Sequence, residues 1–147
     1  MIKNLLVPLD GTELSERAIT QSIDLARQLG AAIVGFVAEP DMPLPNMSTN
    51  PYRYQRDAAA HAVATDTHAH ELLATFGERA QAAGVPFSGR HLRTDGIDVA
   101  IAGVADELDS PMIVMVTHGR GAFAGLLFGS HTKGVMERTK VPLLVVH

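Results

Sequence analysis

Five short apolar runs are spaced along this chain of 147 residues, and a segment with helical periodicity separates each run from the next. Most of the runs are continuously rich in Val, Ile, Leu and Met, which is typical of strands that are covered on both faces. The third run alternates, as a partly exposed or edge strand would. The expected strands are residues 5–9, 33–37, 87–93, 112–116 and 143–146.

Four helices are expected between these strands, at residues 13–29, 57–83, 97–108 and 130–139. The first has Thr12 as a candidate N-cap and Gly30 as its stop. Strands that alternate with helices imply parallel pairing with right-handed crossovers. The sequence therefore predicts one α/β domain over residues 1–147, a five-stranded, doubly wound parallel sheet.

Such sheets bind ligands outside the carboxyl ends of their strands, where the strand order reverses. This rule directs attention to Asp10, to the segment after Val37 and to the loop after Val116. Residues 40–54 hold several prolines and polar residues at the same end, so we expect a loop there. Two interpretations stay open for that loop, a lid over a ligand and a variable surface loop.

Charge and composition exclude several classes of function. The net charge of −4 leaves no broad basic surface for nucleic acid. The chain has no cysteine, which excludes disulfides, thiolate catalysis and zinc sites built on sulfur. No apolar stretch is long enough to span a bilayer, and the first residues lack the features of a signal peptide, so a cytoplasmic location without membrane contact is expected.

A glycine-rich segment from Thr117 to Lys133 leaves the fourth strand and enters the last helix. Glycines allow close approach of a ligand, and Ser130 is a candidate N-cap whose helix offers free N–H groups to an anion. Thr132 adds a hydroxyl, while Arg120 and Lys133 add positive charge. The segment therefore predicts a phosphate site. A glycine loop with a serine cap and no ligand is the alternative, because the segment is neither a Walker A loop nor a GxGxxG fingerprint.

Both ends of the chain resemble the signatures of universal stress proteins. The N-terminal part is similar in VPLDGT (7–12) and SERA (15–18), and the C-terminal part in THG (117–119), GLLFGS (125–130) and VPLLVV (141–146). The resemblance runs from end to end. It implies the Rossmann-like, three-layer sandwich of that family, the adenine nucleotide alpha hydrolase-like fold.

The ATP-binding branch of that family carries the motif Gly-x2-Gly-x9-Gly-Ser/Thr. Gly119, Gly129 and Ser130 match its last three positions, whereas Val116 replaces the first glycine. Two consequences of the valine stay open: it narrows the site, or it adds an apolar contact to the ribose.

The resemblance implies ATP, with Mg²⁺, as the ligand. By this resemblance, Asp10 is expected to accept hydrogen bonds from the ribose hydroxyls. Val37 is expected to contact adenine through its backbone groups, and Met115 and Val116 to flank the sugar. The alternative for Asp10 is capping of the first helix. His131 takes the place of a small apolar residue, so only its backbone N–H is carried over. The implied nucleotide contacts are Pro8, Asp10, Val37, Met115, Val116, Gly119, Arg120, Gly129, Ser130, His131 and Thr132.

The function that this resemblance implies is a nucleotide-binding sensor or adaptor in a stress response. The alternatives are a nucleotide-free member that acts through partner contacts and a slow ATP hydrolase. The last strand is an apolar sheet edge that needs protection, and a homodimer through it is expected. No metal site is assigned to His61, His68 and His70, which are interpreted as a solvated face. Proton transfer by His118 or His131 would need a partner carboxylate, and the sequence indicates none.

Overall fold

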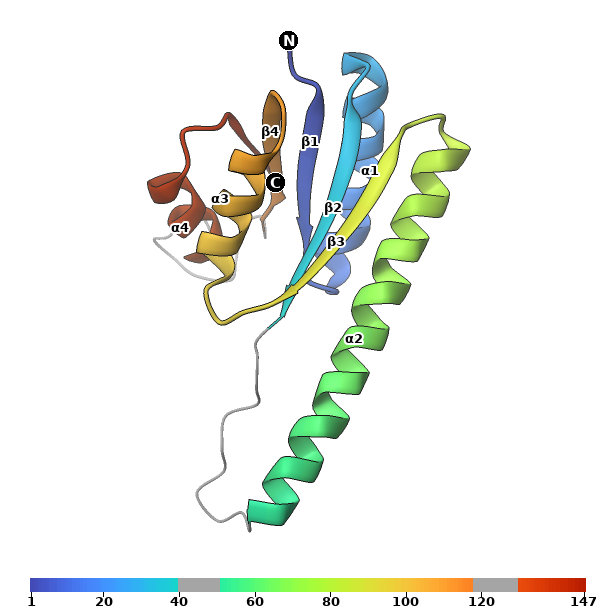
Figure 1. Ribbon diagram of the computed structural model, residues 1–147. Helices are drawn as coiled ribbons and strands as arrows, with labels where there is room; N and C mark the ends of the chain where they lie inside the picture. The colour runs from blue at the N-terminus through green and yellow to red at the C-terminus, as the bar shows by residue number, and fades with distance from the viewer. Residues whose placement is uncertain (40–50, 118–129) are drawn as a thin grey trace.

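The computed structural model describes residues 1–39, 51–117 and 130–147, which alternate strictly between strand and helix (Figure 1). A helix follows each of the first four strands, as the apolar pattern predicts. The elements in chain order are β1 (Asn4–Leu9), α1 (Glu13–Leu29), β2 (Ala32–Glu39), α2 (Pro51–Ala82), β3 (Phe87–Arg93), α3 (Ile97–Glu107), β4 (Pro111–Val116), α4 (Ser130–Arg138) and β5 (Leu143–Val146).

The five strands form one parallel sheet in the order β3-β2-β1-β4-β5. From β1 the chain winds outward to β3, then crosses back to β4 and winds outward to β5. The strand order therefore reverses between β1 and β4, which is the switch point of a doubly wound sheet. The predicted five-stranded, doubly wound parallel fold is confirmed, with β3 and β5 at the edges.

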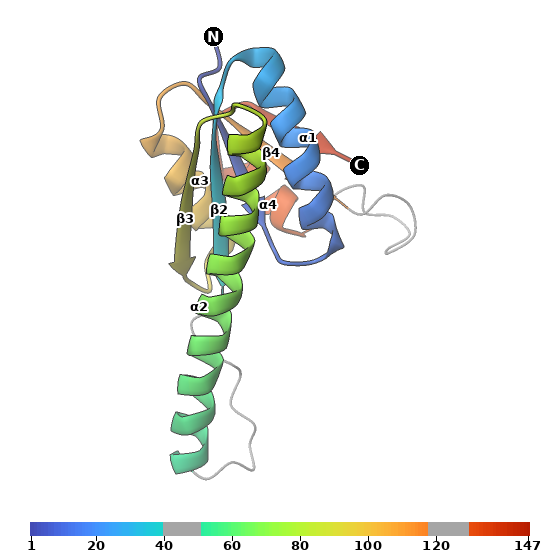
Figure 2. The same cartoon turned by 90° about the vertical axis from the view of Figure 1, so that its right-hand side faces the viewer.

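Helices cover both faces of the sheet, so the molecule has three layers (Figures 1 and 2). Alternate residues of each strand point to opposite faces. In β1, Leu5, Val7 and Leu9 therefore pack with α1 and α2, whereas Leu6 packs with α3 and α4. The first face holds the larger cluster of buried residues, and Phe76 of α2 is fully buried within it.

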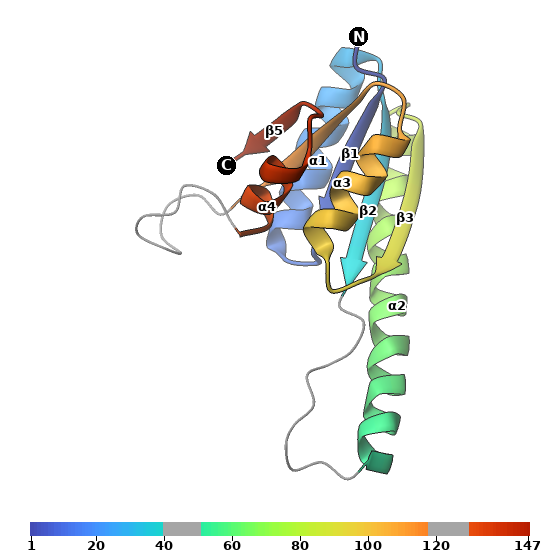
Figure 3. The same ribbon diagram turned by 60° about the vertical axis from the view of Figure 1, so that its left-hand side comes forward.

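The pairing of β1 with β4 stops well before either strand ends. It joins Asn4–Leu6 to the first three residues of β4, with Leu6 opposite Ile113 as the last pair. Beyond this point β1 continues to Leu9 and β4 to Val116, and Figure 3 shows the two strands separating toward their carboxyl ends. Pro8 lies in this stretch and has no N–H to donate. The sheet is therefore open at its switch point.

Two predicted boundaries are wrong. The second helix begins at Pro51 rather than at residue 57, because proline suits the first turn of a helix. Residues 51–54 are therefore helical rather than loop, and residues 40–50 lie outside the described part of the chain. The second strand continues past Val37 to Glu39, since Ala38 and Glu39 pair with β3.

Helix α2 is longer than the sheet is tall, and its first half extends past the carboxyl ends of the strands (Figures 1 and 3). Its buried residues begin at Ala69 and occur in the second half alone. No helix among the residues described has both the length and the apolar character to cross a membrane.

Candidate functional site

The turn from β1 into α1 holds a carboxylate in a fixed position. Oδ1 of Asp10 accepts hydrogen bonds from the N–H of Thr12 at 2.9 Å and from its hydroxyl at 2.7 Å. The buried hydroxyl of Ser15 accepts from the N–H groups of Asp10 and Gly11, at 3.2 and 3.0 Å, and lies 3.3 Å from Oδ1. Among the described residues, the hydrogen bonds that orient the carboxylate come from within five positions of it.

Thr12 is the N-cap of α1, as predicted, because its hydroxyl accepts from the N–H of Leu14 at 3.3 Å. Asp10 does not cap the helix itself but supports the residue that does. Its side chain is exposed, and within the described part of the chain Oδ2 has no hydrogen-bond partner. Oδ1 therefore stabilises the turn, while Oδ2 is left available to a ligand on an exposed side chain.

Helix α2 reaches this turn through a histidine. Gly11 has a φ of +78°, and a Cβ built on it would come within 2.2 Å of Nε2 of His68. His68 and His70 are exposed, as expected of a solvated face, although His68 also lies against the turn. Nδ1 of His70 lies 2.7 Å from the carbonyl oxygen of Asp66, one turn earlier in the same helix. The described residues include no group of three or more side chains that could hold a metal ion.

The predicted contacts on β2 and β4 are core residues. Val37 is 2% exposed and packs on the α1 and α2 face, while Met115 is 8% exposed and packs on the opposite face. Val116 packs beside Val146 against the α1 and α2 cluster, and pairs with it in the sheet. The side chain of Val116 is therefore partly buried against the core, and Val37 and Met115 have mainly backbone to offer a ligand.

The first turn of α4 supplies the opposite side of the switch point. The described part of the helix begins at Ser130, and the residues before it lie outside the described residues, so the N-cap at Ser130 stays a prediction. The first N–H groups of the helix have no acceptor within it, which makes this end electropositive. Thr132 is buried at 3% exposure. Three predicted phosphate contacts, Gly119, Arg120 and Gly129, lie outside the described residues, as does His118.

His131, also in this first turn, has the partner carboxylate that the sequence did not indicate. Its Nδ1 lies 2.8 Å from Oδ1 of Asp98, in the first turn of α3. The structure therefore supplies the carboxylate that was not visible in the sequence. The two residues are 33 positions apart on different helices, and no local pattern in the sequence relates them.

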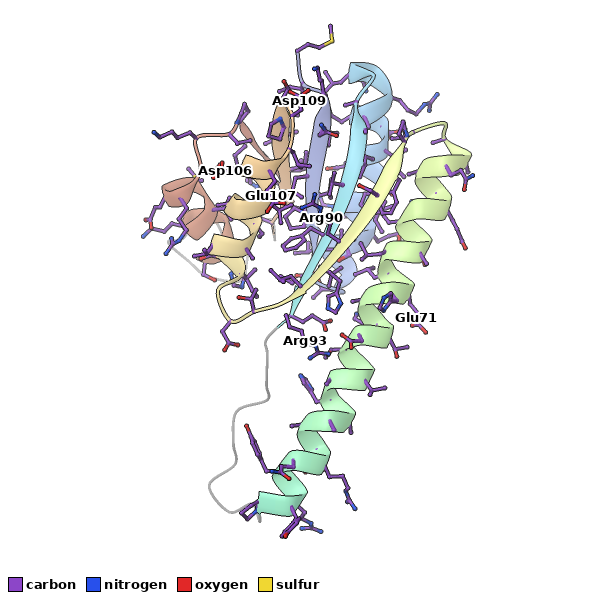
Figure 4. All side chains as sticks on the ribbon, in the orientation of Figure 1. Glu71, Arg90, Arg93, Asp106, Glu107 and Asp109 are labelled. Carbon is purple, nitrogen blue, oxygen red and sulfur yellow. The ribbon has the colours of Figure 1, made fainter. Side chains whose placement is uncertain are left out.

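A second group of charged side chains joins the ends of β2 and β3 to α2. Arg93 donates to Oδ1 of Asp66 at 2.8 Å and lies between β3 and α2 (Figure 4). The two ring nitrogens of His91 lie 3.8 Å from Glu39 and 3.6 Å from Asp66. Within the described part of the chain, Glu39 Oε2 and His91 Nε2 are buried without hydrogen-bond partners. This group ties α2 to the edge of the sheet, apart from the switch point.

The family model described as the universal stress protein family matches residues 1–147. The chain belongs to this family. Among curated proteins, none matches it. The resemblance found in the two terminal signatures is thereby confirmed at the level of the family.

Solved structures of universal stress proteins share the fold. One, in complex with cAMP, is 24% identical with a TM-score of 0.69, and the alignment covers 99% of this chain and 97% of the other. One from Burkholderia pseudomallei is 19% identical with a TM-score of 0.76, covering 98% and 95%. One from Archaeoglobus fulgidus, in complex with dAMP, is 16% identical with a TM-score of 0.66, covering 100% and 98%.

Proposed function

We propose that this universal stress protein binds an adenine nucleotide, ATP with Mg²⁺, across the switch point of its sheet. One observation carries the proposal. The β1–β4 ladder stops at Leu6, and an oriented, exposed carboxylate at Asp10 then faces the same end of the sheet as the free N–H groups that begin at Ser130. A nucleotide needs those two groups, an acceptor for its ribose hydroxyls and donors for its phosphates.

The described residues can be assigned to the ribose, the base and the phosphates of such a ligand. Oδ2 of Asp10 would accept from the ribose, and Pro8 would lie beside the sugar where the ladder has ended. The backbone of Val37 would contact adenine, with Met115 and Val116 near the ribose. The phosphates would meet the N–H groups of the α4 first turn, of Ser130, His131 and Thr132. Mg²⁺ would arrive with the phosphates, because the described residues hold no cluster of metal ligands.

The relatives in complex with cAMP and dAMP support an adenine nucleotide as the ligand class. On this basis we infer a sensor or adaptor in a stress response, whose surface changes with the bound nucleotide. A homodimer through β5 completes the proposal, since β5 is a sheet edge of four apolar residues and Leu144 is 37% exposed. A cytoplasmic location stays a prediction.

Val116 favours a second candidate, a family member that binds no nucleotide and acts through protein contacts. The valine stands where the ATP-binding motif has glycine, and its partly buried side chain packs against the core beside Val146. A Val116→Gly variant separates the two candidates. A large gain in nucleotide affinity would show that the valine restricts the site, whereas an unchanged affinity would remove the argument for the nucleotide-free candidate.

The test of the proposed function is calorimetric titration of the wild-type protein and Asp10→Asn with ATP and Mg²⁺. Asparagine keeps the oxygen that accepts from Thr12 but replaces Oδ2 with an amide nitrogen, which cannot accept a hydrogen bond. Losing a charge-assisted hydrogen bond of about 1.5–3 kcal/mol weakens binding by roughly 10- to 100-fold. Asp24→Asn, on the exposed side of α1, is the matched control and should bind like wild type. No heat and no thermal stabilisation at millimolar ATP would overturn the proposal.

A further inference from the structure

The contact between His131 and Asp98 joins two helices at the N-terminal end of each. Helices α3 and α4 lie side by side on one face of the sheet (Figure 3). Nδ1 of His131 and Oδ1 of Asp98 are 2.8 Å apart, and the two side chains are 58% and 27% exposed. The imidazole is thus held on one side by a carboxylate and open on the other.

Gly134 makes room for that carboxylate. A Cβ built on Gly134 would come within 1.9 Å of Oδ2 of Asp98, so the carboxylate lies directly on the α4 backbone. His131 and Gly134 are three residues apart and share a helical face. Glycine weakens a helix interior, and here its missing side chain is the space that Asp98 fills. The space that holds the Asp98 carboxylate is therefore part of the packing between α3 and α4 rather than an incidental surface contact.

The same geometry directs the second ring nitrogen of His131 away from Asp98. A carboxylate accepts a hydrogen bond, so Nδ1 is the donor in this contact, and in a neutral ring Nε2 carries the lone pair. Nε2 lies on the other side of the ring from Nδ1, and the side chain is 58% exposed, so this nitrogen is open to a ligand. His131 is in the first turn of α4, the end of the helix where the proposed function places phosphate.

Two features of opposite charge lie beside the imidazole, the Asp98 carboxylate and the positive end of the α4 dipole. The other charged groups around this end are Asp95 before α3, Asp10 after β1, and Lys133, which pairs with Glu137 at 3.9 Å. A bound phosphate adds negative charge beside Nε2. That added negative charge favours the imidazolium, whose Nε2–H donates to a phosphate oxygen.

We propose that His131, positioned by Asp98, takes up a proton when a nucleotide binds and becomes a charged phosphate ligand at the N-terminus of α4. The inference rests on the proposed function, because it concerns the phosphate end of the same site. It adds a ligand that the family motif does not supply at this position. Nucleotide affinity then falls as the pH rises through the range in which histidine loses its charge.

The experiment is titration with ATP and Mg²⁺ in two buffers of different ionisation enthalpy, which measures the protons taken up on binding. His131→Gln keeps a polar side chain without a titrating ring, and ATP's own protonation cancels between the two proteins. We expect the wild type to take up more protons than His131→Gln. From about pH 6 to about pH 8, the ratio of the wild-type to the variant affinity falls by up to about tenfold per pH unit.

Two further variants separate positioning from general structure. Asp98→Asn and Gly134→Ala both remove the carboxylate from the space that holds it without touching the phosphate, and both should reduce proton uptake toward that of His131→Gln. His61→Gln, on the first half of α2, is the matched histidine control and should keep the wild-type uptake. Equal proton uptake in wild type and His131→Gln would overturn this inference while leaving nucleotide binding intact. A wild-type protein that binds no nucleotide would overturn the proposed function as well.

Discussion

The two sides of the switch point hold their carboxylates in opposite ways. Asp10 is fixed by Thr12 and Ser15, residues of its own turn, through hydrogen bonds that include a buried hydroxyl. Asp98 is fixed by His131 of another helix and by the space that Gly134 leaves. The first arrangement is part of the start of α1, whereas the second exists after α3 and α4 have packed. Removing the contacts of Asp10 should therefore lower the free energy of unfolding, whereas removing those of Asp98 should mainly change nucleotide binding.

Ser15→Ala is the strongest test of the local side. The hydroxyl of Ser15 is buried and accepts the N–H groups of Asp10 and Gly11, so its removal leaves two backbone donors without an acceptor. We expect the free energy of unfolding to fall by about 1–3 kcal/mol, measured by urea denaturation. Ser22→Ala is the matched control, because Ser22 is a buried serine of the same helix whose hydroxyl donates to the carbonyl of Ile19. Equal losses in the two variants would contradict the special role of Ser15.

Gly134→Ala tests the other side and should change stability much less. Alanine improves a helix interior by about 1 kcal/mol relative to glycine. The new Cβ displaces the Asp98 carboxylate, and the exposed contact with His131 that is lost contributes about 0–1 kcal/mol. The two effects nearly cancel, so urea denaturation should give a free energy of unfolding within about 1 kcal/mol of wild type. A loss as large as that of an overpacked core, up to about 3 kcal/mol, would show that Asp98 cannot move aside.

A third carboxylate, far from the switch point, gives the smallest effect. Asp109 lies at the amino ends of the strands (Figure 4), where the side chain of Lys3 donates to it at 2.7 Å. Hydrogen bonds from Lys3 and then from Ser110, with the charge of Lys3, lower the pKa of Asp109. The stabilisation is therefore complete above the unfolded-state pKa of about 3.9 and is lost as the pH falls through the folded-state value.

The corresponding measurement is the thermal midpoint of the wild type and Lys3→Met between about pH 6 and about pH 2. Because Asp109 is fully exposed, we expect a small difference between the two proteins that disappears at the acid end of the range. A difference that stayed constant at every pH would mean that Lys3 acts through its packing rather than through the carboxylate.

The same contrast explains how much could be predicted from the sequence. The strands, their parallel pairing and the cap at Thr12 follow from patterns within a few residues, because buried strands and helix starts are specified locally. The position of Asp10 at the end of β1 follows from the same patterns. The role of Ser15 was not predicted beyond its place in a signature, although its spacing from Asp10 is local.

The contacts that could not be predicted join elements distant in the chain. Asp98 and His131 meet because α3 and α4 pack on one face, and the approach of His68 to Gly11 requires α2 to lie beside the first turn. The early start of α2 at Pro51 was missed because prolines and polar residues before it favoured a loop. Tertiary packing decides each of these features, and a single sequence carries little record of it.

The early end of the β1–β4 ladder also bears on the mechanics of the sheet. In the sheet, only three residue pairs, at the amino ends of the strands, join β3-β2-β1 to β4-β5. Asp10 and the start of α4 lie at the opposite end, where the two halves of the sheet are not paired. A molecule that bound both would cross-link the two halves, and its binding free energy would directly oppose their separation.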